Sequence, residues 1–492
     1  MASASILLAN PFPYPPGVDL GLGYLATALR RSGYDVRILE LAPSVQTPAD
    51  FAARLRREPP DCIGFKVWSS ALPEVRRYLD AAREAAPEVP VVLGGPHATG
   101  TGAAVLEQFG EVAFAFSGEA ELGLPRLVRE ILRGGTPRGS VLARIPGLIW
   151  RARDGVRVND QAFPEDLDAL GAPAWDLFDF DMYFGFDRAS HETLDALRFN
   201  WLHVQSTRGC PHHCTYCLAP QLAGHRIRKH SPGAMAAQLT ELRDRYGVRF
   251  FSFADDNLTY DRPFAVDLFE HLEPLGLRWT CNSNGVEFKT LDEDMVRRMV
   301  RSGCEKITVG VESGSERVLK LMGRHYTQQD VHAAVARIRK ASDVWLTAFI
   351  LMGFPGETDD DVRQTLSLIS RLDIDQIYVN LFTPWPGTPI TKKLQREGWL
   401  KSSDLSRQWY QTATMSTQDM PRWRLELYFY LAQLVFYGRP TRMWCNLRRA
   451  GLAKLSYEAY LITRKVLRPR SPEAIHFGRL RFGKGPGAAD HR

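Results

Sequence analysis

Three cysteines in one short stretch are the residues of this chain best suited to chemistry. Cys210, Cys214 and Cys217 stand at C-x3-C-x2-C spacing, directly after the apolar run 202–204. The glycine and proline beside the first cysteine disfavour a helix, so we expect the cysteines on a loop that leaves a strand. Three thiolates on such a loop suit an iron–sulfur cluster, and a fourth iron without a thiolate would be open to another molecule.

The residues alone leave other uses of these cysteines open. A zinc site would take His212 or His213 as a fourth ligand, although no second pair of ligands follows, as zinc modules usually have. Disulfides are disfavoured, because the chain has seven cysteines, which is an odd number, and shows no signal peptide.

The cysteine spacing and its neighbours resemble the radical S-adenosylmethionine (radical SAM) superfamily. The resemblance implies that Cys210, Cys214 and Cys217 hold three irons of a 4Fe–4S cluster. It also implies that the fourth iron binds the amino and carboxylate groups of S-adenosylmethionine (SAM). Tyr216 stands where the superfamily has an aromatic residue near the adenine.

Length and composition indicate a soluble globular protein with more than one domain. The 492 residues exceed what one core usually holds, and 45% apolar with 24% charged residues is ordinary. A net charge of +6 does not by itself indicate nucleic acid. No apolar run is long enough to cross a bilayer. We expect a cytoplasmic protein, because a reducing compartment also suits an oxygen-sensitive cluster.

Residues 1–140 form the first predicted domain, in which strands and helices alternate. Strands that recur every ~25–30 residues with helices between them indicate βαβ units and a doubly wound parallel sheet, of the Rossmann-like α/β class. Ligands bind such sheets beyond the carboxyl ends of the strands. The predicted strands are 5–9, 35–41, 62–67, 89–93 and 112–116, and the predicted helices are 22–32, 49–58, 73–86, 103–109 and 124–133.

Two motifs at these strand ends indicate a ligand. G-G-P-H-A-T at 94–99, followed by G-E-A-E at 118–121, resembles the cobalamin-binding domain that precedes many radical SAM domains. A glycine pair lets a large flat ligand approach the backbone, and the lack of G-x-G-x-x-G disfavours a dinucleotide. The resemblance implies that cobalamin contacts Pro11, Gly17, Ser69, Gly94, Gly95, Pro96, His97, Gly118 and Glu119.

The lower face of the cobalt has no obvious protein ligand. The motif D-x-H-x-x-G, whose histidine binds cobalt in mutases, is absent, and His97 is the only histidine in the first 190 residues. We expect His97 to pack or form hydrogen bonds in its glycine-rich turn and not to ligate cobalt.

Residues 141–195 are a predicted linker, with the hairpin turn pair Asp154-Gly155, and residues 196–390 are a predicted second α/β domain. The resemblance implies a partial (β/α)6 barrel, whose chemistry lies at the carboxyl ends of the strands. Residues 391–492 are predicted to be mainly helical, with an aromatic-rich core helix at 425–437. The predicted strands of the barrel are 202–206, 248–253, 278–283, 306–311, 345–351 and 375–382, and its helices include 233–246, 292–301, 329–341 and 360–370.

Polar residues follow the strands of this second domain. The sequence D-D-N at 255–257 stands where the superfamily usually has G-G-E. Its carboxylates and amide suit the α-ammonium group of an amino acid. We expect Cys281 and Cys304 to be buried apolar residues. A radical route needs no general base, so no catalytic side chain is assigned. The resemblance implies a SAM site formed by Tyr216, Asp255, Asp256, Asn257, Ser283, Glu312 and Ser313.

Over about four fifths of its length, the chain resembles a cobalamin-dependent radical SAM enzyme. The resemblance implies that an external flavodoxin- or ferredoxin-type donor reduces the cluster, which cleaves SAM to a 5′-deoxyadenosyl radical that takes hydrogen from a small-molecule substrate. The commonest outcome in this branch is methylation of an unactivated carbon, or of phosphorus. The alternative is a cyclase or rearranging enzyme without net methyl transfer, and no residue separates the two.

Other function classes fit less well. A methylthiotransferase of this superfamily needs three further cysteines in its N-terminal domain, where only Cys62 is present. A non-enzymatic cobalamin sensor would not need a SAM site. No nucleic-acid-binding motif accompanies the basic C-terminal region, so we expect no nucleic-acid partner.

Overall fold

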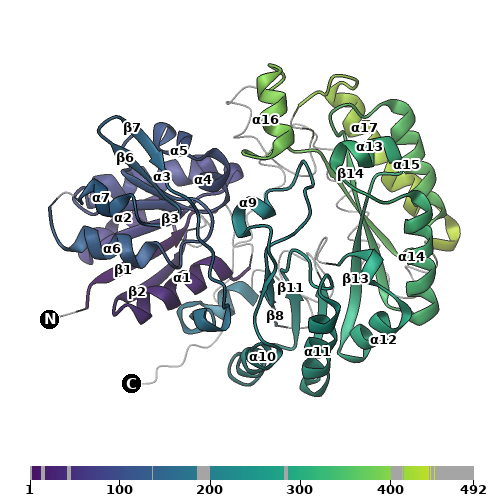
Figure 1. The fold of residues 1–492 in the computed structure, drawn as a ribbon, viewed down its shortest axis with the longest axis horizontal. Helices are drawn as coiled ribbons and strands as arrows, with labels where there is room; N and C mark the ends of the chain where they lie inside the picture. Colours follow the sequence, from purple (N-terminus) through teal and green to yellow (C-terminus); the bar gives the residue numbers. More distant parts are fainter. Residues whose placement is uncertain are drawn as a thin grey trace.

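The computed structural model describes residues 3–12, 17–41, 46–135, 137–184, 200–281, 286–400, 413, 415–442, 444 and 448. These residues form two α/β units, and the short helix α9 (Ala219–Ala223) lies between them (Figure 1). Across the described ranges, we find no helix that combines the length and the apolar character of a membrane span.

The first unit is built on a seven-stranded sheet with the order β2-β1-β3-β4-β5-β6-β7. Its first five strands are parallel, which confirms the predicted sheet, and β1, β3 and β4 bury apolar residues in a core on each face, as in doubly wound folds. These strands are β1 (Ser5–Asn10), β2 (Asp35–Glu40), β3 (Cys62–Lys66), β4 (Val91–Gly94) and β5 (Phe114–Phe116).

Helices cover both faces of this sheet because each carries one apolar stripe. Leu22, Ala26 and Leu29 of α1 (Leu20–Arg31) share a core with α6 (Leu124–Leu132) on one face. The other face is covered by α2 (Pro48–Arg57), α3 (Leu72–Ala85) and α5 (Ala104–Gln108), and the short α4 (Pro96–Thr101) begins just after β4.

The hairpin at Asp154-Gly155 is present, as the turn pair predicted. Its strands β6 (Leu148–Ala152) and β7 (Gly155–Val158) extend the first sheet, because β6 pairs antiparallel with β5. The turn chemistry was visible in the sequence, but the strand partner was not.

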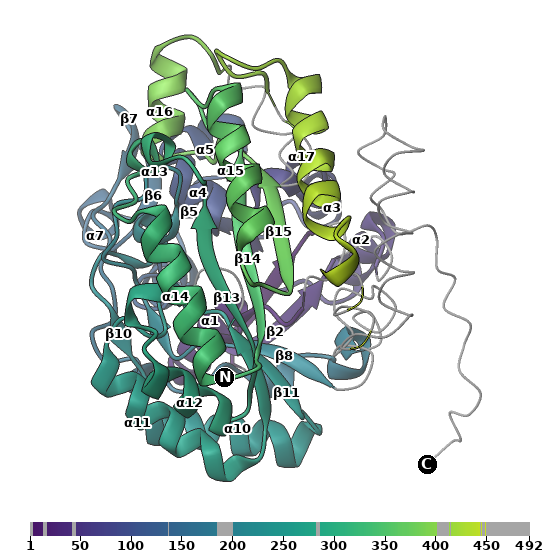
Figure 2. The ribbon, with the colours of Figure 1, turned by 90° about the vertical axis from the view of Figure 1, so that its right-hand side faces the viewer.

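The second unit is a six-stranded parallel sheet with the order β15-β14-β13-β12-β11-β8. The strands form an arc with helices along its outer side, and Figure 2 shows α14, α15 and α17 side by side over the last strands. Within the described residues β8 and β15 do not pair, which is the partial barrel expected. The strands are β8 (Trp201–Val204), β11 (Phe250–Phe253), β12 (Arg278–Cys281), β13 (Cys304–Glu312), β14 (Trp345–Met352) and β15 (Gln376–Leu381).

The outer helices begin where the sequence supplies caps. Thr327 and Thr358 each form a capping box with an aspartate three residues later, which satisfies free N–H groups in the first turn. The helices are α10 (Pro232–Tyr246), α11 (Arg262–Leu272), α12 (Glu293–Arg301), α13 (Glu316–Met322), α14 (Gln328–Ala341), α15 (Asp359–Arg371), α16 (Pro389–Arg396) and α17 (Arg422–Tyr437).

The aromatic-rich helix α17 packs into the core of the second unit, as predicted. Leu425, Phe429, Ala432 and Phe436 are buried and belong to the same apolar cluster as the residues of β13, β14 and β15 that face the outer helices. The helix therefore closes one side of the arc.

The two units touch through loops at the carboxyl ends of their strands. Gly100 of α4 has no room for a β-carbon, because the carbonyl of Pro386 lies against it. The Gln221 side chain of α9 donates to the Gly387 carbonyl at 2.7 Å, and Gln161 donates to the Gln221 carbonyl at 3.1 Å. The edge at which parallel sheets bind ligands is therefore the edge where the units meet.

Candidate functional site

The three cysteines lie on a loop between β9 (Thr207–Arg208) and α9, as predicted. Two later helices hold this loop. The Thr215 N–H donates to the carbonyl of Met322 at 2.9 Å, and the Thr215 carbonyl accepts from Ile390 N–H at 3.0 Å. Gly209 has φ of +94° and faces the carbonyl of Arg226, so only glycine fits there. The loop is therefore fixed at its start and at its middle.

The thiols are partly covered and receive backbone hydrogen bonds. Burial raises the pKa of Cys210 to about 11 and of Cys217 to about 12, and hydrogen bonds from His212 N–H and Ala219 N–H oppose these shifts. Metal binding must displace the thiol protons, and backbone N–H groups near the sulfurs are a usual setting for iron–sulfur clusters. The donor set therefore fits such a cluster.

The structure weakens the zinc alternative. His212 Nε2 lies 3.2 Å from a Glu287 carboxylate oxygen, and the His213 ring packs on His225 with centroids 4.5 Å apart. Over the residues described, we find no group of three His, Cys, Asp or Glu side chains arranged around one metal ion. Both histidines that could complete a zinc site therefore already contact other side chains.

Glu312 is the most unusual residue near the cysteine loop. It is fully buried and has φ of +58°, the only non-glycine residue with positive φ in the described part of the chain. Its Oε1 accepts from Arg324 at 2.7 Å, whereas Oε2 is buried with no described partner. Strained backbone and an unpaired buried oxygen are features of ligand sites, and the oxygen fits an N–H or O–H donor of a ligand.

Arg324 connects Glu312 to the cysteine loop. Its Nε donates to the Tyr216 hydroxyl at 3.2 Å, and the Tyr216 ring meets Phe354 edge-on at 6.3 Å. Burial raises the pKa of the Cys214 thiol, and the Arg324 cation partly offsets this shift. The sequence alone does not indicate Arg324, because nothing in the local pattern after α13 marks it as buried.

The residues of the D-D-N stretch have different environments. Asp255 is buried and accepts three hydrogen bonds, from Ser206 N–H at 3.1 Å, Ser206 Oγ at 2.6 Å and Thr207 N–H at 2.5 Å. Burial raises the pKa of Asp255 to about 6 despite these bonds. Its carboxylate therefore holds the turn between β8 and β9.

The next two residues remain open to a ligand. Burial raises the pKa of Asp256 to about 6, and a hydrogen bond from Gly209 N–H opposes this shift. Asn257 Oδ1 is buried with no partner among the described residues. Asp256 lies beside the cysteine loop, and Asn257 follows the end of β11. A polar ligand at this place would satisfy both groups.

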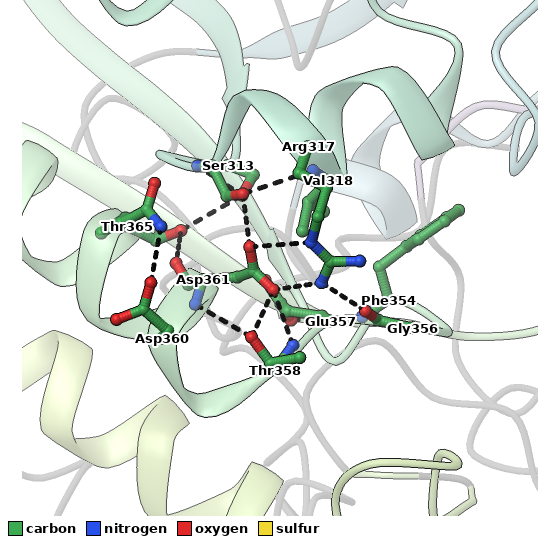
Figure 3. Close-up of polar contacts among 12 residues, drawn as sticks. Ser313, Arg317, Val318, Phe354, Gly356, Glu357, Thr358, Asp360, Asp361 and Thr365 are labelled. Atoms are coloured by element: carbon green, nitrogen blue, oxygen red, sulfur yellow. Dashed lines mark hydrogen bonds and ion pairs between the residues drawn. The ribbon is translucent and has the colours of Figure 1, made fainter.

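Ser313, which is also expected at the SAM site, forms hydrogen bonds with neighbouring protein groups. Its hydroxyl lies 3.2 Å from Thr365 Oγ1 and accepts from Ser315 N–H at 3.1 Å, so it faces the turn that begins α13 (Figure 3). The same network contains Asp361, which accepts from Ser315 Oγ at 2.5 Å and pairs with Arg317. Ser283, also expected at the SAM site, lies outside the described residues.

Glu357, in the same turn region, is expected to make stability depend on pH. Its Oε2 accepts from Gly353 and Phe354 N–H, Oε1 has no described partner, and burial raises its pKa to about 8. The folded state then holds a proton that the unfolded state loses near pH 4.5, so its contribution to stability is lost as pH rises towards 8. Glu357→Gln should remove a pH dependence of a few kcal/mol.

Unfolding midpoints at pH 5, 6.5 and 8.5 would check this prediction. The stability of Glu357→Gln relative to the wild type should rise with pH. The exposed neighbour Glu316 provides the control, because Glu316→Gln should leave the pH dependence of the wild type unchanged. Equal pH profiles for Glu357→Gln and the wild type would contradict the assignment.

In the first unit, the expected cobalamin residues form an open glycine face at Gly94 alone, because a β-carbon on Gly95 or Gly118 would lie within 3.1 Å of Val67 or Gln161. A β-carbon on Gly94 would meet nothing within 4 Å, and Gly17 and Gly95 have φ of +100° and +94°. Trp68 Nε1 and Asn10 Oδ1 are buried without a described partner. An open backbone with unpaired polar atoms fits a flat ligand that carries amide groups. Pro11 follows β1 directly, and Pro96 begins α4.

Other residues expected at this face contact protein groups. His97 is buried, with Nδ1 2.9 Å from Ser69 Oγ and Nε2 2.8 Å from Gln108 Oε1, which confirms that it packs and forms hydrogen bonds in its turn. Gly118 N–H donates to Thr99 Oγ1 at 2.9 Å. The Glu119 carboxylate binds two arginines of the second unit. Ser69 and His97 therefore bind each other beside the glycine face, and Glu119 binds the second unit.

Comparison with known proteins agrees with this arrangement. The model of the radical SAM superfamily matches residues 204–369, and the model of the B12 binding domain matches residues 13–128. A Pyrococcus horikoshii protein named as an uncharacterized methyltransferase is 31% identical over 376 residues, which are 76% of this chain and 77% of that protein.

Two further relatives differ in the reaction that their names describe. Cytidylyl-2-hydroxyethylphosphonate methyltransferase of Streptomyces wedmorensis is 24% identical and covers 77% of this chain and 78% of its own. Anaerobic magnesium-protoporphyrin IX monomethyl ester cyclase of Cereibacter sphaeroides is 24% identical, over 82% of this chain and 64% of the cyclase.

Solved structures share the fold. The radical SAM methyltransferase TsrM of Kitasatospora setae, with cobalamin and a [4Fe-4S] cluster bound, has a TM-score of 0.66 at 20% identity, over 80% of this chain and 78% of that chain. The cobalamin-dependent SAM radical enzyme OxsB has a TM-score of 0.67 at 16% identity, over 88% of this chain and 66% of the OxsB chain. With its B12-binding and radical SAM domains, this chain belongs to the cobalamin-dependent radical SAM enzymes, whose cofactors are a 4Fe–4S cluster, SAM and cobalamin.

Proposed function

We propose that this enzyme transfers a methyl group to an unactivated carbon, or to phosphorus, of a small metabolite. The observation that carries the proposal is the meeting of two ligand faces at one edge. The unpaired oxygens of Glu312 and Asn257 lie in the unit that carries the cysteine loop, and the open glycine face at Gly94 belongs to the other unit. Relatives named as methyltransferases, at 31% and 24% identity, support methyl transfer.

The proposal assigns the cofactors to residues of each unit. Cys210, Cys214 and Cys217 hold the cluster. Glu312, held by Arg324, accepts hydrogen bonds from SAM. Further contacts with SAM come from Tyr216, Asp256, Asn257 and Ser283, and the corrin lies over Pro11, Gly17, Gly94, Gly95, Pro96 and Gly118.

The cofactors supply the hard chemistry: the cluster with SAM provides the radical that removes hydrogen, and the corrin delivers the methyl group. The protein positions them. Arg324 pairs with the buried Glu312 carboxylate at 2.7 Å and so fixes its position, and Asp255 fixes the turn that leads into the cysteine loop.

We further propose that reduction comes from a flavodoxin- or ferredoxin-type protein in the cytoplasm. The chain has seven cysteines, and only three of them are clustered, so the sequence offers no second iron–sulfur centre to relay electrons. An external protein must then deliver each electron to the cluster.

Turnover with SAM labelled in its methyl group would test the reaction. We expect a product that carries one labelled methyl group when the reconstituted enzyme is given a metabolite library and a reductant under anaerobic conditions. Mass spectrometry of the products and of 5′-deoxyadenosine provides the measurement.

The same experiment distinguishes the cyclase alternative, which the relative from Cereibacter sphaeroides supports. A cyclase would form 5′-deoxyadenosine and a product without the label. That result would contradict methyl transfer and leave the cofactor assignments intact.

A further inference from the structure

A buried group of four charged side chains joins the two units. Arg208 Nη1 lies 2.8 Å from Glu121 Oε1 and 3.1 Å from Glu119 Oε2, and Arg228 Nη2 lies 2.5 Å from Glu119 Oε1. The four side chains are between 3% and 9% exposed. The glutamates follow β5 of the first unit, and the arginines belong to β9 and β10 (Arg228–Lys229) of the second.

Aromatic and histidine side chains extend this contact. The Arg208 guanidinium lies over the Tyr24 ring of α1, 4.4 Å from its centroid. The Tyr24 hydroxyl lies 3.0 Å from His230 Nε2, and His230 Nδ1 lies 3.1 Å from Asp168 Oδ1 of the linker. A cation over an aromatic face in a desolvated site adds to the attraction between the units.

The arginines bracket the cysteine loop. Arg208 stands two residues before Cys210, and Asp255 binds the two residues before Arg208. After the loop, Arg228 donates to the carbonyl of Ala223, the last residue of α9, at 2.8 Å. A shift of Glu119, which binds both arginines, would therefore move both ends of the loop, and a shift of Glu121 would move the end at Arg208.

Buried ion pairs are a poor way to hold two domains together for stability alone. The free energy needed to remove two charges from water is nearly as large as the free energy gained from their attraction. Well-packed apolar side chains of similar volume often stabilise a contact equally well. Guanidinium–carboxylate pairs do restrict position, because the planar donors fix both distance and direction. The charges therefore indicate a need for a set geometry.

We propose that Glu119, Glu121, Arg208 and Arg228 form an interdomain clamp that sets the position of the cysteine loop relative to the corrin. The second and fourth residues of the G-E-A-E motif are then positioning residues and not cobalamin ligands. The inference rests on the cofactor sites assigned under the proposed function, and it adds the element that aligns them.

The test uses reconstituted holoenzyme with the variants Glu119→Gln, Glu121→Gln and Arg208→Lys. Pulsed electron paramagnetic resonance measures the distance between the reduced cluster and Co(II) in cobalamin. Absorbance follows methyl transfer from SAM to the reduced corrin without substrate. The control is Asp176→Asn, which breaks the exposed 2.8 Å pair between Arg30 of α1 and the linker.

We expect each clamp variant to keep the iron content and cobalamin affinity of the wild type. Its distance distribution should broaden, and methyl transfer to the corrin should slow by about 100-fold, since small misplacements of reacting groups have effects of that size. Asp176→Asn should match the wild type in every measurement.

Wild-type distances and rates in the clamp variants would overturn the proposal. Loss of cobalamin affinity in Glu119→Gln with an unchanged distance would also overturn it, because Glu119 would then be a ligand. If single variants do not fold, Glu121→Leu combined with Arg208→Met removes both charges while keeping the volume filled, and an unchanged distance in that protein would refute the clamp. A wild type without any interaction between cluster and cobalt would instead refute the proposed function.

Discussion

Cys214→Ala is expected to abolish both the iron–sulfur absorbance and all cleavage of SAM. Cys214 is buried in the middle of the loop, and its loss leaves two thiolates for a cluster that needs three protein ligands. The loop itself should persist, because its contacts with α13 and α16 run through Thr215. Cobalamin uptake should be retained, since the first unit has its own core on each face of its sheet. Iron content, absorbance and 5′-deoxyadenosine formation provide the measurements.

Cys281→Ala is the matched control for this prediction. Cys281 is a buried cysteine at the end of β12 in the same unit, and it lies outside the cysteine loop. Its replacement should keep the cluster and the cleavage of SAM. Cleavage at the wild-type rate in Cys214→Ala would refute the cluster assignment.

Glu312→Gln is expected to lower SAM cleavage by about 100-fold or more while the cluster remains. The variant leaves the buried Arg324 cation without its carboxylate, and removing one partner of a buried pair costs about 3–5 kcal/mol. It also replaces an acceptor oxygen by an amide at the position proposed to meet SAM. The measurements are SAM affinity and the rate of 5′-deoxyadenosine formation at equal iron content.

Glu305 on the same strand supplies the comparison. Glu305 pairs with Arg278 near the surface, with side chains 30% and 39% exposed, so Glu305→Gln should leave SAM cleavage nearly unchanged. Loss of the cluster in Glu312→Gln would show a structural role, and an unchanged rate would remove Glu312 from the SAM site.

The sequence was sufficient for the features that depend on local spacing. The three cysteines stand within eight residues, and Gly209 and Pro211 flank the first of them, so the loop followed from the motif. The two parallel sheets followed from alternating strand and helix patterns, because burial on both faces gives each strand a short apolar run. Family resemblance then supplied the cofactors.

Only the tertiary structure showed which polar groups already have protein partners. His97 and Ser69 bind each other, and Asp255 and Ser313 hold turns, although each occupies a motif position at a strand end. Strand ends bring ligand contacts and turn contacts to the same edge, and sequence position does not separate them. The hydrogen-bond partners do, because a buried side chain that is already satisfied has little left to offer a ligand.

The interdomain clamp and the contacts of Arg324 could not be predicted from the sequence, because the partners are far apart along the chain. Glu121 and Arg208 are 87 residues apart, Glu119 and Arg228 are 109 apart, and Arg324 reaches back 108 residues to Tyr216. The sequence by itself determined that this chain has a cysteine loop and two parallel sheets, since those depend on residues close along the chain. Only folding decided which buried charges meet, because a buried arginine is stabilised by whichever carboxylate the packing of both sheets brings beside it.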